Sequence, residues 1–196
     1  MKKKINTNII KWITSILNKR ISYELELNLD SNNWIINIVH SKKKIKIPLN
    51  YIFYNSFFND KFPYSDYKFE IDFLKNYEYL PAPGYDRCCK PLLLKESDYF
   101  LINFDILGLL YWMLTRSEEI YTPDNLLDCF DRFPAKKSHG YKHNYLHRPL
   151  VDEWLFIFQK ISQDLWPKIK INSKNYKLIL THDVDIPSRF GFRSKT

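Results

Sequence analysis

The chain has 196 residues, of which 45% are hydrophobic and 17% aromatic, and its formal net charge is +8. This much apolar surface can form a core, which excludes a disordered chain, and only four glycines argue against a glycine-rich phosphate-binding protein. Residues 1–50 hold ten basic and three acidic side chains, so the other residues carry a net charge of +1 (20 basic against 19 acidic). The basic start is interpreted as a solvated face, with contact to a polyanion or a membrane surface as the alternative.

No export signal or membrane span is expected. The longest apolar run, Ile106–Leu114, has half the length that a bilayer requires. Cys88, Cys89 and Cys129 have neither the number nor the spacing of a disulfide framework or a common metal site. They indicate a reducing cytoplasm and are expected to be small buried hydrophobic residues.

The first fifty residues predict a helix and three strands. INTNIIKWITSILNKR, residues 5–20, has the spacing of an amphipathic helix. SYELELNL alternates apolar and polar side chains, which is typical of a half-buried strand. With the turn at residues 30–33, residues 22–49 predict a three-stranded meander that packs against the helix.

The middle of the chain is expected to be less regular. Prolines and aromatic residues crowd residues 50–90, where we expect only a short helix at 69–76. Short strands are predicted at 92–94 and 99–102, and a buried helix at 105–117, which Asp105 caps. Residues 121–149 should form a long loop-rich connection.

A second helix is predicted at residues 151–165, followed by a polar linker at 168–174 and an apolar strand at 176–182. Residues 1–170 should therefore form one α+β amino-terminal domain, and the strand should either dock on it or expose an edge. The expected core of this domain is Leu25, Leu27, Ile36, Leu107, Leu110, Trp112, Trp154 and Phe158.

Asp183 and Asp185 follow the apolar strand and are two residues apart, so both side chains point to the same side while the chain stays extended. Carboxylates at the carboxyl end of a strand can hold a divalent cation or accept a proton from water. The alternative is an Asp-rich turn in which Asp185 caps the segment after Pro187.

Four blocks resemble a branch of the polysaccharide deacetylase family, the metal-dependent NodB-type carbohydrate esterases. LTHDVD, residues 180–185, is similar to the first motif of the deacetylase domain. FDILGLLYWMLTRSEE, DRFPAKKS and HRPLVDEW resemble the amino-terminal domain of unknown function that precedes it in that branch. The blocks fall within residues 100–190, and their order and spacing carry the resemblance.

The resemblance implies a site at the start of a β/α barrel. In the family's first motif, the first of two adjacent aspartates is the general base and the second binds the metal. Asp183 matches the base, and Asp185 takes the metal by inference, because Val184 stands at the second position. His182 replaces an aromatic residue and would lie beside the metal ligands.

The resemblance also implies a hydrolase of carbon–nitrogen bonds other than peptide bonds, which acts in carbohydrate metabolism. It would use zinc or a similar divalent metal to remove N-acetyl groups from a glycan. The family completes its site with a later His-x-x-x-His motif, and RFGFRSKT after the aspartates holds none. Residues 176–196 are therefore expected to be the start of a truncated barrel, and this chain alone is expected to bind no metal and to be inactive.

Two alternatives come from other classes of protein. One is a stand-alone carbohydrate-binding or interaction module, and the weaker one is a nucleic-acid-binding module; we expect no nucleic-acid binding at physiological salt. The reading frame downstream distinguishes the first alternative from an enzyme, since further barrel motifs would indicate the enzyme.

Several polar residues between 116 and 153 allow two interpretations. His139, His143 and His147 have metal-like i, i+4 spacing, but Gly140 and neighbouring prolines favour a polar, partly solvated loop. The charged residues beside the apolar helices are expected to form ion pairs that fix the loop to the helices, with a buried Arg–carboxylate pair among them, and substrate contacts are the alternative. These residues are Arg132, Glu118, Glu119, Arg148, Asp152 and Glu153.

Overall fold

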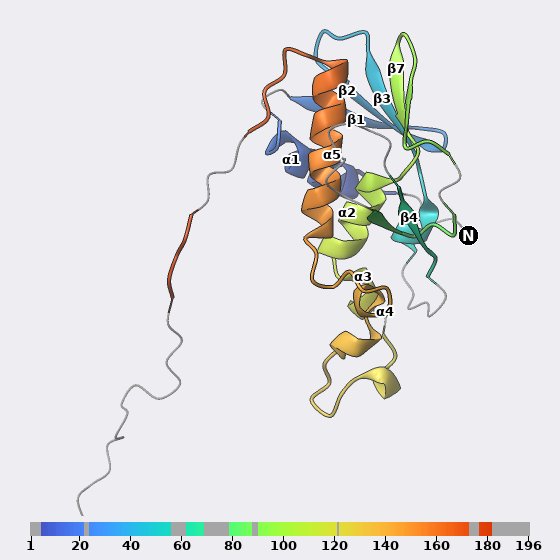
Figure 1. Cartoon of the computed structure of the whole chain (residues 1–196), viewed down its shortest axis with the longest axis vertical. Coiled ribbons are helices and arrows are strands. Elements are labelled where there is room, and N and C mark those ends of the chain that lie inside the picture. Colours follow the sequence, from blue (N-terminus) through green and yellow to red (C-terminus); the bar gives the residue numbers. More distant parts are fainter. Residues whose placement is uncertain are drawn as a thin grey trace, which may run out of the picture.

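The computed structural model describes residues 5–21, 24–55, 62–68, 79–87, 90–120, 122–172 and 177–181. Within them, helices pack on one face of a five-stranded sheet, and a two-stranded sheet lies beside it (Figure 1). The strands are β1 (Leu25–Asp30), β2 (Asn33–Ile38), β3 (Lys44–Pro48), β4 (Tyr64–Tyr67), β5 (Leu80–Pro83), β6 (Leu93–Lys95) and β7 (Tyr99–Ile102). The α-helices are α1 (Thr7–Asn18), α2 (Ile106–Leu114), α3 (Ser117–Ile120), α4 (His139–Lys142) and α5 (Leu150–Leu165).

The predicted meander is confirmed. The strand order is β1-β2-β3-β7-β6, with antiparallel pairing except between β3 and β7, which are parallel. Burial alternates along β1, β2, β3 and β7, so one face of the sheet is covered and the other is more exposed. Helix α1 packs along β1, as expected from its apolar stripe.

The core joins the sheet to α1, α2 and α5. Trp34, Ile36, Ile45 and Ile47 come from the covered face of the sheet, and α2 buries most of its surface. All eight residues that the sequence predicted as core are buried, and they are Leu25, Leu27, Ile36, Leu107, Leu110, Trp112, Trp154 and Phe158.

Asp105 caps α2, as predicted, and is completely buried. One carboxylate oxygen accepts a hydrogen bond from the Gly108 N–H at 2.8 Å, and the other accepts from the Asn50 N–H at 2.8 Å. Burial raises the pKa of Asp105 to about 7, although both bonds favour its ionised form. The cap therefore ties α2 to the segment that follows β3.

The structure corrects the expectation of an irregular connection at residues 50–90. β4 and β5 form an antiparallel pair, and β5 contains Pro81 and Pro83. Proline lacks the N–H that a central strand needs, but it is accepted in a short two-stranded sheet. A 3-10 turn at Tyr51–Tyr54 precedes the pair, and the predicted helix at 69–76 lies outside the described residues.

Two further expectations are wrong. The predicted polar linker at 168–174 is not a simple linker in its described part, 168–172, because Ile169 is buried and Ile171 forms a β-bridge with Ile21. Cys129 is exposed rather than buried, and the other two cysteines lie outside the described residues.

The predicted strand at 176–182 is not formed in its described part. Residues 177–181 have neither helical nor strand structure, and they lie apart from the body of the domain (Figure 1). Leu178, Ile179 and Leu180 are 65%, 67% and 79% exposed. An extended segment gains ladder hydrogen bonds only beside another strand, and none of the described strands pairs with it.

Candidate functional site

Two of the three blocks that we singled out in the domain, 104–119 and 147–154, contribute side chains to one pocket. Block 104–119 forms α2 and α3, block 131–138 leads into α4, and block 147–154 begins α5. The segment that carries α3 and α4 extends away from the sheet, beyond the ends of α2 and α5 (Figure 1). Within the described residues 122–149, the predicted loop contains short helical turns at Asp124–Leu126, Ala135–Lys137 and His139–Lys142.

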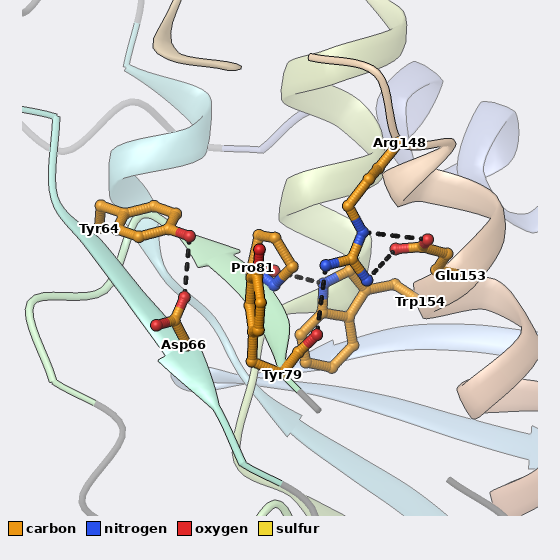
Figure 2. Close-up of polar contacts among 7 residues, drawn as sticks. All are labelled: Tyr64, Asp66, Tyr79, Pro81, Arg148, Glu153 and Trp154. Atoms are coloured by element: carbon orange, nitrogen blue, oxygen red, sulfur yellow. Dashed lines mark hydrogen bonds and ion pairs between the residues drawn. The ribbon is translucent and has the colours of Figure 1, made fainter. Parts of the chain in front are cut away.

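Arg148 forms the buried ion pair that the sequence led us to expect. Its guanidinium donates to both carboxylate oxygens of Glu153, at 3.2 and 2.9 Å, and the two side chains are 14% and 12% exposed. It also donates to the Tyr79 carbonyl oxygen at 3.2 Å (Figure 2). This two-point contact fixes the chain at the start of α5 against the segment that enters β5.

Trp154 makes a second connection between α5 and β5. Its indole N–H donates to the Pro81 carbonyl oxygen at 2.9 Å (Figure 2). Its ring stacks on Phe104 at a centroid distance of 4.0 Å. The ring is fully buried, so its single polar atom needs this acceptor. Block 147–154 therefore acts as a connector between the helical layer and the small sheet.

The β4 strand adds a partly exposed aromatic surface nearby. The Tyr64 hydroxyl donates to the Asp66 carboxylate at 2.8 Å, and burial with this carboxylate holds the pKa of Tyr64 well above its usual range (Figure 2). The Tyr64 ring stacks on His143 at 4.1 Å. The Tyr64 hydroxyl is engaged by Asp66, so this cluster offers aromatic contact surface rather than a free tyrosine hydroxyl.

His139 is buried and held in one tautomer. Its Nε2 lies 3.2 Å from the Phe62 carbonyl oxygen, which can only accept, so this nitrogen carries the proton. Nδ1 then accepts from the Tyr145 hydroxyl at 2.6 Å. Burial lowers the pKa of His139 to about 4, which keeps the ring neutral near pH 7.

The metal interpretation of the three histidines is not supported in the described part of the chain. The i, i+4 spacing does bring the rings of His139 and His143 to 4.3 Å, but both nitrogens of His139 are already engaged. Across the residues that the structure describes, no group of three or more His, Cys, Asp or Glu side chains is arranged to hold a metal ion. The expected polar loop is also only partly right, because one of its histidines is buried.

Glu118 links α3 to α4. Its carboxylate accepts from the His139 backbone N–H at 2.9 Å, and burial raises its pKa. The neighbouring Glu119 pairs with Arg116 on the surface. On the exposed loop, Arg132 pairs with Asp128 at 3.1 Å. Glu118 therefore has the expected structural role, whereas the pairs of Glu119 and Arg132 are local and exposed.

A pocket of about 190 Å³ lies where α2, α3 and α4 meet. It combines an apolar wall with guanidinium and carboxylate groups at its edge. Gly140 borders it at close quarters, since a Cβ atom there would lie 3.3 Å from the Leu146 backbone. The complete lining is Trp112, Met113, Arg116, Glu118, Glu119, Gly140, Tyr145, Leu146 and Arg148. Such a lining is suited to holding a small polar ligand.

The structure does not describe the residues predicted for catalysis. The proposed base Asp183, the metal ligand Asp185 and the adjacent His182 are all outside the described residues. In the described part, none of the helices has the length and apolar character needed to cross a bilayer.

Comparison with known families decides the family of this chain. A family model described as "Family of unknown function (DUF7033)" matches residues 1–167. The chain belongs to the DUF7033 family. The match covers the whole sheet and every helix described above, so the pocket and its connectors are part of the DUF7033 domain.

A curated protein shares a short stretch with this DUF7033 member. "Putative cysteine ligase BshC" of Staphylococcus epidermidis is 45% identical over 56 residues, which is 29% of this chain and 9% of that protein. No solved structure matches the chain.

Proposed function

We propose that this chain is the amino-terminal part of a polysaccharide deacetylase-like protein of the cytoplasm. The complete protein would remove N-acetyl groups from a glycan with the help of a divalent metal such as zinc. Asp183 would act as the general base and Asp185 as a metal ligand, with His182 beside them. A hydrolytic metal lowers the pKa of its bound water and needs several fixed protein ligands.

The meeting of two of the three blocks supports the proposal most directly. The blocks resemble the amino-terminal domain of that deacetylase branch, and they lie far apart along the chain. In the structure, blocks 104–119 and 147–154 both contribute side chains to one pocket, and block 131–138 ends at Ser138, which caps α4 beside it. Fourteen residues separate the end of α5 from the LTHDVD block.

The short match to the cysteine ligase supports no proposal for this chain. It covers 9% of that protein, and a stretch of this size does not carry a ligase activity. A carbohydrate-binding module without catalysis is the second candidate. A pocket beside α1, whose lining includes Trp12, Asn6 and Asn8, favours it.

Acetate release by the protein from the complete reading frame tests the proposal. With N-acetylated chitooligosaccharides and zinc, Asp183→Ala should lower kcat by at least about a hundredfold and keep the bound metal, because a general base contributes on this scale. Asp185→Ala should lose both metal and activity. Acetate release that is the same in the wild type and in both variants would contradict the proposed roles.

A further inference from the structure

A second pocket, of about 360 Å³, lies between α1 and α2. Helix α1 supplies one wall, and Tyr54 and Tyr111 supply the other. These two rings stack at a centroid distance of 5.2 Å, which gives the pocket a firm aromatic wall. The residues that line it are Ile5, Asn6, Asn8, Ile9, Trp12, Tyr54, Tyr111 and Thr115.

Trp12 is the exposed aromatic residue of this pocket. Its side chain is 36% exposed, and its ring meets Tyr111 edge to face at 6.3 Å and 87°. This contact fixes the orientation of the indole, while part of its surface stays open to a ligand. A rigid, partly exposed indole provides contact area at a low cost in conformational entropy.

Two amides lie on the same side of α1 as the indole. Asn8 precedes Trp12 by four residues, which places both on one helix face. Asn6 caps α1, since its side-chain oxygen Oδ1 accepts from the Ile9 N–H at 2.9 Å, and the NH₂ of the same side chain can still donate. The side-chain amide of Asn8, which lines the pocket, makes no hydrogen bond to another described residue and can both donate and accept.

The charge of the pocket differs from that of the chain. Among the described residues that line it, none is acidic or basic, whereas the chain has a net charge of +8. An acidic ligand would find no counter-ion among these described lining residues. Aromatic surface with amide and hydroxyl groups instead matches a sugar ring, which has an apolar face and a rim of hydroxyl groups.

We propose that this pocket binds one ring of an uncharged glycan. The apolar face of the ring lies on Trp12, and its hydroxyl or acetamido groups hydrogen-bond to Asn6 and Asn8. The choice of a glycan rests on the function proposed above; the neutral charge and the position of the subsite come from the pocket itself. The pocket then serves recognition and takes no part in the chemistry assigned to Asp183.

Titration calorimetry on the full chain tests this subsite with tetra-N-acetylchitotetraose as the probe. The wild type should bind it with an affinity that does not change between 50 and 500 mM NaCl, because the ligand is neutral. Trp12→Ala should weaken binding about tenfold and Asn8→Ala about fivefold, the scale of one aromatic contact and one hydrogen bond. A fully deacetylated chitotetraose, which is cationic, and an acidic oligogalacturonate should bind more weakly.

The matched control is Phe156→Ala on α5. Phe156 is 39% exposed, close to the value for Trp12, and does not line the pocket. Its substitution should leave the affinity unchanged, and circular dichroism should show that all variants are folded. Failure of the wild type to bind the neutral tetramer, an unchanged affinity in Trp12→Ala, or equal losses in Trp12→Ala and Phe156→Ala would each overturn the proposal.

Binding that is confined to the acidic oligomer and disappears at high salt would also overturn it, in favour of the basic face of residues 1–50. The calorimetric result is independent of catalysis, because calorimetry measures binding alone, whereas acetate release depends on Asp183 and Asp185. The subsite can therefore fail while the deacetylase proposal stands, and the reverse also holds.

Discussion

The polar side chains of the site region are positioned by partners that lie far away in the sequence. Arg148 reaches Tyr79, and His139 reaches Phe62. The residue types and their spacing in the sequence predicted a buried Arg–carboxylate pair in this region, and the pair of Arg148 with Glu153 confirms it. They could not predict the burial of His139, because it depends on rings from α2 and the segment before β4.

Removal of one member of the buried ion pair should destabilise the fold. Glu153→Ala leaves the guanidinium of Arg148 poorly solvated and without its carboxylate, which should lower the free energy of unfolding by about 2 to 3 kcal/mol. Urea denaturation followed by circular dichroism measures this change. Lys95→Met, which breaks an exposed pair with Asp164, serves as the control and should leave the midpoint unchanged. Equal effects of the two substitutions would mean that the Arg148 pair is not specially stabilising.

His139 should make the fold sensitive to acid. Its folded-state pKa of about 4 lies below the ordinary value of about 6.5, so the unfolded chain binds more protons between these values. Stability from the neutral ring is therefore complete above pH 6.5 and declines as the pH falls towards 4, by up to about 3 kcal/mol. His139→Gln keeps an N–H donor for the Phe62 carbonyl and does not titrate, so its stability should fall less over this range. Parallel stability curves for the two proteins between pH 7 and pH 4 would contradict a neutral buried His139.

At the scale of the elements, regular patterns were predicted well and pairings were not. The alternation in β1, the apolar stripe of α1 and the cap of α2 each have a local cause, and the structure contains all three. The parallel pairing of β3 with β7 joins strands about fifty residues apart, and no local signal specifies it. Prolines also concealed the β4–β5 pair, since they normally count against strands.

The cap of α2 should contribute more to stability than the cap of α1. Asp105→Ala leaves the N–H groups of Gly108 and Asn50 without an acceptor. This substitution should lower the free energy of unfolding by about 2 to 4 kcal/mol. Asn6→Ala removes an exposed cap with one hydrogen bond and should cost about 1 kcal/mol. Guanidinium chloride denaturation of both variants gives the comparison. A cost for Asp105→Ala no larger than that for Asn6→Ala would show that the buried N–H groups find other partners.

At the scale of the whole molecule, a packed α+β domain is followed by an exposed apolar segment. Leu178, Ile179 and Leu180 make no strand in the described part, although their sequence is that of a buried strand. The sequence could predict the apolar character of this segment but not what would cover it, because burial of a strand requires neighbouring strands. Exposed apolar segments of this kind favour self-association.

A charge within this segment should improve solubility without a change in stability. Ile179→Lys places an ammonium group at a position that is 67% exposed, so the midpoint of thermal unfolding should be the same as in the wild type. Light scattering at increasing protein concentration should show less aggregate for the variant. A lower unfolding midpoint would mean that Ile179 is packed against the domain.

The central claim is that glycan recognition by the DUF7033 domain and hydrolysis at the aspartates are separate parts of one deacetylase-like protein. Steady-state acetate release from N-acetylated chitooligosaccharides by the protein from the complete reading frame tests this claim most directly. Trp12→Ala should raise KM about tenfold with little change in kcat, and Asp183→Ala should lower kcat by at least about a hundredfold with little change in KM. An unchanged rate in Asp183→Ala, or a loss of kcat without a change of KM in Trp12→Ala, would contradict it.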